Sequence, residues 1–241
     1  MTVAVLAGGL ATRLRSVASD VPKAMVSIAG KPFIDHQLDL LRMQGYRRVV
    51  LCVGHLGEAI QKHVGTGERW GMEVDYSFDG SNLLGTGGAL VQALPKLGDE
   101  FFVLYGDSYL LCDFQKVEQA FHSSGKPGLM TVLRNEDKWD ASNVSFRNGA
   151  VLRHNKKTRT QDMLYIDYGL SCLKASVFSQ YPSSVPFDLS DLFGRLADAQ
   201  EMAGFEVSQR FYEIGSPRGL AEAQEYLSKI PHGAKFNDHL H

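Results

Sequence analysis

The chain has 241 residues, of which 44% are hydrophobic and 22% are charged, and this composition excludes a disordered or fibrous protein. Its 25 Lys and Arg residues against 27 Asp and Glu residues give a net charge of −2, so we expect no nucleic-acid partner bound through bulk charge. No apolar run approaches the ~20 residues needed to cross a membrane, and no basic segment precedes the first apolar run, so we expect a cytoplasmic protein with no membrane partner.

In the first half of the chain, short apolar runs alternate with segments of helical spacing. The apolar runs predict buried strands at residues 2–7, 48–53, 72–77 and 101–105. The helical spacing predicts helices at residues 33–42, 58–64, 86–94 and 114–121. Strands that alternate with helices of this length indicate βαβ units, and therefore an α/β fold with a mostly parallel central sheet flanked by helices.

The second half of the chain changes character. β-like runs at residues 129–133, 144–146, 150–153 and 165–173 predict added strands, and helical patterns return at 189–200 and 217–227. We expect a single domain over residues 1–230, with the parallel core in about 1–125 and a second set of contacts in about 126–230. Residues 231–241 are polar and irregular, and we expect a flexible tail there.

The strongest local pattern combines a strand end, two glycines and two cations: Leu6, Ala7, Gly8, Gly9, Arg13 and Lys23. Glycines let backbone N–H groups approach a phosphate closely. An arginine fork and a lysine point charge both suit phosphate oxygens. The pattern is neither the dinucleotide fingerprint nor a P-loop, and the alternative interpretation is a strand-to-loop turn with two solvated cations.

A second glycine-rich pattern follows a predicted strand and opens a predicted helix: Gly85, Thr86, Gly87 and Gly88. Its bare backbone could hold a phosphate or lie against a flat base, and the alternative is a tight strand–helix turn. Both glycine patterns stand at the carboxyl ends of predicted strands, where open α/β sheets bind ligands.

Two carboxylates are candidate ligands of a hard cation. Asp107 follows the apolar strand at 101–105, and Glu213 lies in a short predicted strand before a helix that begins at Pro217. Mg²⁺ is usually held by one or two carboxylates together with substrate phosphates. The alternatives are a turn or cap residue for Asp107 and an exposed strand residue for Glu213.

These patterns resemble, in the same order, the motifs of the sugar-1-phosphate nucleotidyltransferases: Leu-Ala-Gly-Gly…Thr-Arg-Leu…Pro-Lys, Leu-Gly-Thr-Gly-Gly-Ala, Gly-Asp and Glu-Ile-Gly-Ser-Pro. The resemblance runs from residue 3 to about residue 227. It implies a Rossmann-like core and Mg²⁺-dependent transfer of a nucleotidyl group from an NTP to a sugar 1-phosphate, with release of pyrophosphate. The chain would then consist of a nucleotide-binding half and a sugar-phosphate-binding half.

The resemblance also implies roles for single residues. The first glycine pattern would bind the nucleotide and its phosphates, with Arg13 and Lys23 as catalytic cations, and the second pattern would recognise the base. Asp107 matches the first metal ligand and is the third catalytic residue, while Glu213 stands where many relatives have an Asp ligand. The chain departs from the commonest loop pattern at Ala11, where most relatives have Gly.

Within the family, the second half of the chain looks most like the bacterial heptose-1-phosphate guanylyltransferases. The likeness lies in Ser-Asn-Val at 142–144, Asn-Lys at 155–156 and Tyr-Ile-Asp-Tyr-Gly at 165–169. It implies GTP and a heptose 1-phosphate as substrates, and it implies acceptor-binding residues at Asn143, Lys156, Asp167, Tyr168 and Gly169. On charge alone, Lys157 is an equal candidate for the acceptor phosphate.

We hypothesise an in-line attack of the sugar phosphate on the α-phosphorus of the NTP, with Arg13 at the pentavalent centre, Lys23 bridging the phosphates, and Lys156 on the acceptor. Three alternatives stay open: a uridylyl-, thymidylyl- or cytidylyltransferase, an enzyme for a non-sugar phosphate, and a catalytically silent regulatory subunit. The oligomeric state also stays open.

Overall fold

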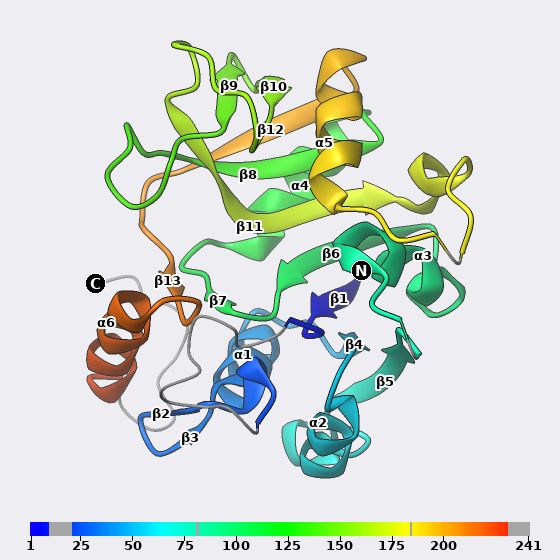
Figure 1. Ribbon diagram of the computed structural model, residues 1–241, viewed down its shortest axis with the longest axis vertical. Helices are drawn as coiled ribbons and strands as arrows, with labels where there is room; N and C mark the ends of the chain where they lie inside the picture. Colours follow the sequence, from blue (N-terminus) through cyan, green and yellow to red (C-terminus); the bar gives the residue numbers. More distant parts are fainter. Residues whose placement is uncertain (10–20, 81, 184, 231–241) are drawn as a thin grey trace.

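The computed structural model describes residues 1–9, 21–80, 82–183 and 185–230, so the predicted tail at 231–241 lies outside the described residues. The described residues form a nine-stranded mixed sheet with the strand order β5-β4-β1-β6-β11-β8-β12-β10-β9 (Figure 1). Separate apolar clusters on its two faces join the sheet to helices. The predicted α/β fold is therefore confirmed.

The first half of the sheet is parallel and consists of β5 (Glu73–Phe78), β4 (Arg48–Val53), β1 (Thr2–Leu6) and β6 (Glu100–Tyr105). Alternate residues of β1 enter opposite apolar clusters, with Val3 and Val5 on one face and Ala4 on the other. A strand that is buried on both faces needs a nearly continuous apolar run, and such a run allows these strands to be predicted from the sequence.

The second half of the sheet is mixed and consists of β11 (Tyr165–Lys174), β8 (Gly128–Arg134), β12 (Met202–Val207), β10 (Ala150–His154) and β9 (Val144–Arg147). Strand β11 runs antiparallel to both of its main neighbours, β6 and β8. Its register with β8 shifts between Asp167 and Ser171, and Gly169 within this stretch has a φ of +103°. This irregularity is a bulge-like bend in the middle of the sheet, beside the end of β6.

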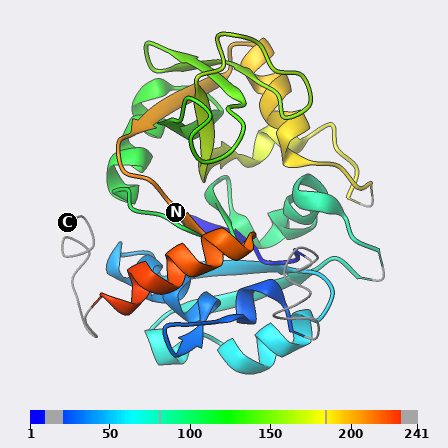
Figure 2. The same ribbon diagram turned by 60° about the vertical axis from the view of Figure 1, so that its left-hand side comes forward.

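Helices cover both faces of the sheet (Figures 1 and 2). One apolar cluster joins the sheet to α1 (Phe33–Met43), α2 (Gly57–Val64) and α4 (Phe114–Ser124). The other joins it to α3 (Gly85–Leu97) and α5 (Leu189–Asp198). The described residues also contain three 3₁₀ turns: η2 (Lys23–Met25), η3 (Glu68–Trp70) and η4 (Ala175–Phe178).

The last helix, α6 (Pro217–Ser228), returns to the first half of the chain (Figure 2). A third apolar cluster packs it against α1 and against the hairpin of β2 (Ser27–Ile28) and β3 (Lys31–Pro32). Just before α6, strand β13 (Tyr212–Glu213) pairs antiparallel with β7 (Ser108–Tyr109). This short ladder sets Glu213 opposite Ser108, and it therefore brings two distant segments of the chain together next to Asp107.

The observed elements follow the predicted ones closely, with one omission in the large sheet. Strand β12 falls just after the predicted helix at 189–200 and was not expected. None of the helices in the described parts of the chain is long and apolar enough to cross a membrane.

Candidate functional site

A cleft of about 630 Å³ lies where β6, the bent part of β11 and the start of α6 meet. That volume is typical of a small-molecule site. The cleft gathers predicted residues from both halves of the chain, and its lining includes Lys23, Asp107, Asn143, Lys156, Asp167, Tyr168, Gly169 and Glu213. Its lining in the described residues does not include the glycines at 8–9 or 85–88.

Within the cleft, Lys23 and Asp107 form an ion pair with 2.5 Å between Nζ and Oδ2. Asp107 reaches this position through a sharp turn at Gly106, whose N–H donates to the Leu6 carbonyl at 3.0 Å. A Cβ on Gly106 would lie 2.5 Å from that carbonyl oxygen, so only glycine lets the end of β6 pass so close to β1. The predicted catalytic lysine and carboxylate are therefore adjacent.

Glu213 is bound to the first turn of α6. Its carboxylate accepts hydrogen bonds from the backbone N–H of Gly215, from the N–H of Ser216 at 3.1 Å and from the Ser216 hydroxyl. The Ser216 Oγ in turn accepts from the Gly219 N–H at 2.9 Å. A negative charge is favourable at this end of a helix, so Glu213 has a structural role that the sequence analysis did not foresee.

Gly215 marks the point where the charged groups meet. A Cβ placed on it would lie 2.7 Å from Glu213 Oε2, 2.8 Å from Lys23 Nζ and 3.5 Å from Asp107 Oδ2. Both carboxylates thus border one small volume, although the described residues contain no cluster of three or more His, Cys, Asp or Glu side chains suited to a metal. Two carboxylates supplemented by phosphate oxygens would fit Mg²⁺. Asp107 is paired with Lys23 through Oδ2, whereas backbone and hydroxyl donors already bind both oxygens of Glu213.

A second group of residues that line the cleft is connected by hydrogen bonds. The Asp167 N–H donates to Asn143 Oδ1 at 3.2 Å, and Asp167 Oδ1 accepts from the Gly169 N–H at 3.0 Å. The Tyr105 hydroxyl donates to Asp167 Oδ2 at 3.3 Å, and Lys156 Nζ lies 5.8 Å from the centre of the Tyr105 ring. Burial, followed by the nearby Asp167 charge, raises the pKa of Tyr105 well above its ordinary value, so the hydroxyl stays a donor.

Tyr168 contributes to the cleft without offering its hydroxyl to a ligand. Its side chain is buried, and its hydroxyl oxygen accepts from the Leu111 N–H at 2.9 Å. Its ring packs edge-on against Phe211. The predicted role of Tyr168 in substrate binding therefore stays a prediction, and its described contacts are structural.

The first glycine pattern is only partly described. The Ala7 N–H donates to the Cys52 carbonyl at 2.8 Å, which holds the end of β1 beside β4. A Cβ on Gly8 would lie 3.0 Å from the Gly54 nitrogen, whereas Gly9 has open space around its Cα. Arg13 lies outside the described residues. The phosphate-binding role of this segment stays a prediction.

The second glycine pattern packs against residues 185–187. A Cβ on Gly87 would overlap the Phe187 ring, and one on Gly85 would lie 2.6 Å from the Phe187 carbonyl oxygen. Thr86 Oγ1 accepts from the Leu189 N–H at 2.8 Å, at the start of α5. Close packing is therefore one reason for these glycines, and base recognition by Gly85–Gly88 stays a prediction.

Several residues that line the cleft were not predicted as site residues: Tyr105, Trp139, Arg210, Gly215 and Ser216. Ser216 could have been found, because a serine directly before a proline-started helix is a common N-cap. Gly215 stands in the Glu-Ile-Gly-Ser-Pro motif, whereas Tyr105, Trp139 and Arg210 have no local signal, since their positions in the cleft depend on how distant segments pack.

The chain belongs to the nucleotidyl transferase family, which its sequence matches over residues 2–229. The resemblance inferred from the motifs is therefore confirmed. The chain is 30% identical over 230 residues to D-glycero-α-D-manno-heptose 1-phosphate guanylyltransferase of Aneurinibacillus thermoaerophilus, covering 94% of this chain and 98% of that protein.

Other relatives differ in length and in the substrate that their names give. The chain is 29% identical over 218 residues to UTP–glucose-1-phosphate uridylyltransferase of Synechocystis, which covers 83% of this chain but 56% of that protein. It therefore spans little more than half of that relative.

The structure of HddC from Yersinia pseudotuberculosis complexed with GMP-PN matches with a TM-score of 0.78 and 28% identity, covering 94% of this chain and 99% of that one.

Proposed function

We propose that this chain transfers a nucleotidyl group from an NTP to a sugar 1-phosphate and releases pyrophosphate. One observation carries the proposal: a single cleft is lined both by the Lys23–Asp107 pair with Glu213 and by Lys156 with Asp167. The reaction must bring two polyanions together, and it needs no covalent nucleophile from the protein because the attacking phosphate oxygen is already an anion. Positioning and charge compensation are what these residues can supply.

The roles follow from the two groups of residues that line the cleft. Asp107 would hold Mg²⁺, with Glu213 beside it, and the bound ion would neutralise phosphate charge. Lys23, beside Asp107, would bridge the α-phosphate and the incoming phosphate. Arg13 would stabilise charge at the reacting phosphorus.

On the acceptor side, Lys156 would bind the sugar's phosphate. The Asp167 carboxylate would accept hydrogen bonds from sugar hydroxyls, with Asn143 and the Gly169 backbone beside it. The hydrogen bonds that this carboxylate accepts from the Gly169 N–H and the Tyr105 hydroxyl would hold it in one orientation before the sugar arrives.

For the particular substrates, we propose GTP and a heptose 1-phosphate. The support is the near-complete mutual coverage between this chain and the heptose 1-phosphate guanylyltransferase of Aneurinibacillus thermoaerophilus. We also propose a cytoplasmic location, with which the free thiols of Cys52, Cys112 and Cys172 agree.

A substrate matrix tests the proposal. GTP, UTP, CTP and dTTP are each combined with heptose 1-phosphate, mannose 1-phosphate and glucose 1-phosphate, with and without Mg²⁺, and pyrophosphate release is measured. We expect the highest kcat/KM for GTP with heptose 1-phosphate and no release without the metal. Efficient use of UTP or CTP but not GTP would overturn the guanylyl assignment. Nucleotide binding without release in any combination would identify a silent subunit instead.

A further inference from the structure

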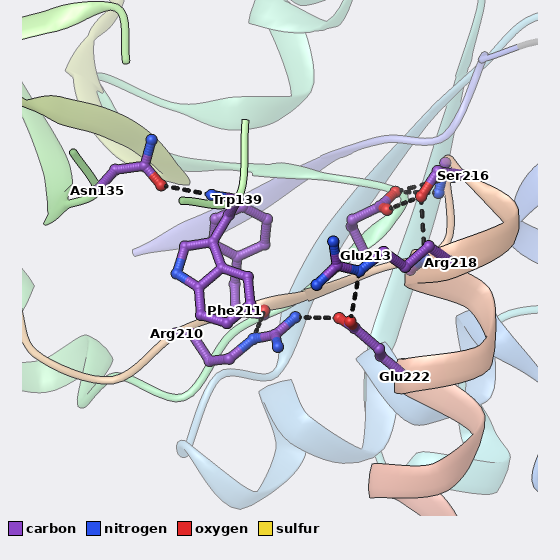
Figure 3. Close-up of polar contacts among 10 residues, drawn as sticks. Asn135, Trp139, Arg210, Phe211, Glu213, Ser216, Arg218 and Glu222 are labelled. Carbon is purple, nitrogen blue, oxygen red and sulfur yellow. Dashed lines mark hydrogen bonds and ion pairs between the residues drawn. The ribbon is translucent and has the colours of Figure 1, made fainter. Parts of the chain in front are cut away.

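Trp139 lies in the turn between β8 and β9, where Asn135 contacts it (Figure 3). The fully buried Asn135 organises this turn: its Oδ1 accepts from the Trp139 N–H at 3.1 Å, and its Nδ2 donates to the Asp140 carbonyl at 2.6 Å. Arg159 adds hydrogen bonds to Asp137 and to the Ser142 carbonyl. The backbone that carries the indole is therefore fixed from several sides.

The indole itself is also held. The Arg210 guanidinium carbon lies 3.9 Å from the centre of the Trp139 ring, and the same guanidinium pairs with Glu222 of α6 at 2.5 Å (Figure 3). Arg218 donates to the other oxygen of Glu222 at 2.9 Å. Stacking on an arginine that is itself ion-paired limits the orientations that the indole can adopt.

Despite this support, the Trp139 side chain stays 43% exposed, and it lines the cleft. An exposed, pre-oriented aromatic surface in a polar cleft favours a ligand with one flat apolar face and a polar rim. A sugar ring has this character, because its hydroxyls lie around the rim while C–H groups form its faces. The polar partners of such a rim, Asn143 and Asp167, line the same cleft.

We propose that Trp139 is a specificity-determining residue that stacks on the ring of the acceptor sugar. This inference rests on the proposed function, since it concerns the acceptor of that reaction. A nucleobase would be the other flat ligand, but in the described residues the glycine segments predicted to bind the nucleotide, 8–9 and 85–88, lie outside the lining of this cleft. The acceptor is therefore the ligand that reaches the indole.

The chain offers a direct readout, because it has two tryptophans and the other one, Trp70, is 7% exposed in the core. In Trp70→Phe, tryptophan emission reports on Trp139 alone. In Trp139→Phe it reports on Trp70 alone. Heptose 1-phosphate, mannose 1-phosphate and glucose 1-phosphate are titrated into each variant, with GTP and inorganic phosphate as comparison ligands.

We expect a saturable change in emission of the Trp70→Phe variant with the sugar 1-phosphate that gives the highest turnover, and none with inorganic phosphate. The Trp139→Phe variant should show no change with either. In kinetics, Trp139→Ala should raise KM for the sugar phosphate about tenfold and leave KM for the NTP unchanged, whereas Trp139→Phe should recover most of that loss.

Three results would overturn the inference. The first is tryptophan emission that responds to GTP but not to the sugar phosphate. The second is a KM for the sugar phosphate that Trp139→Ala leaves unchanged. The third is a Trp139→Ala variant in which KM rises equally for both substrates and the melting temperature falls. The last would mean that Trp139 only supports Arg210. Failure of the proposed function is distinguishable, because the Trp70→Phe control would then release no pyrophosphate with any sugar phosphate.

Discussion

Gly215→Ala adds one methyl group at the point where the charged side chains of the cleft meet. The new Cβ would lie 2.7 Å from Glu213 Oε2 and 2.8 Å from Lys23 Nζ, whereas ordinary van der Waals contact begins at 3.4 Å. Both groups must therefore retreat by about 0.6–0.7 Å. Asp107 Oδ2, at 3.5 Å, is touched but not displaced directly. The φ of Gly215 is outside the left-handed region, so alanine itself adds no backbone strain.

The expected effect is large on turnover and small on stability. A misplacement of about 1 Å in a catalytic group can cost on the order of 10²-fold in rate, so we expect kcat to fall by about 10- to 100-fold. The displaced atoms are the terminal groups of partly exposed side chains, although hydrogen bonds hold Glu213, so the cost in unfolding free energy should be about 1 kcal/mol, at the lower end of the range for overpacking. For a domain of this size that lowers the melting temperature by about 2–4 °C.

Pyrophosphate release and thermal melts measure the two effects, and Ser216→Ala is the matched control. That variant removes a hydroxyl that donates to Glu213 and caps α6, but it leaves Lys23 and Asp107 in place. It should lower the melting temperature by a similar amount and lower kcat far less. Wild-type turnover in Gly215→Ala would show that the positions of Lys23 and Glu213 do not control catalysis, and equal loss of turnover in both variants would contradict a specific role for Lys23.

Three more predictions follow from single contacts. Asp107→Ala should lower kcat by about 10²–10³-fold while circular dichroism and melting stay close to wild type, and an active variant would remove Asp107 from the mechanism. Tyr105→Phe loses the hydroxyl that donates to Asp167, so it should raise KM for the sugar phosphate about three- to tenfold and leave KM for the NTP unchanged. The control Tyr76→Phe, at the edge of the sheet, should change neither KM. Burial lowers the pKa of His154, so as the pH falls this histidine is protonated in the unfolded chain before it is protonated in the folded protein. The melting temperature should therefore drop on acidification below about pH 6.5. The His154→Asn variant should show a smaller drop.

The parallel half of the fold could be predicted from the sequence because its strands are buried on both faces and therefore form apolar runs. Strand β4 matches the predicted run at 48–53 at both ends. Strand β12 was missed because its sequence contains Gly204 and Glu206 and lacks a clear period. Its position is fixed by parallel pairing with β8, a long-range contact that no local pattern reveals.

For the site, motifs found the charged residues but not their surroundings. Lys23, Asp107 and Glu213 stand in short recognisable segments, and the structure brings them together. The engagement of Glu213 with α6 could not be foreseen, because it depends on the β7–β13 pairing. Trp139 was missed for a similar reason, since an isolated tryptophan in a polar loop gives no sign that an arginine 71 positions later will stack on it.

The most direct test of the account is the fate of the α-phosphate of the NTP. The protein is incubated with Mg²⁺, α-³²P-labelled GTP and heptose 1-phosphate, and the labelled products are separated. Attack at the α-phosphorus predicts that the label moves entirely into a nucleotide sugar while unlabelled pyrophosphate is released in equal amount. Label recovered as GDP with free phosphate, or as GMP with no sugar attached, would contradict nucleotidyl transfer in this cleft.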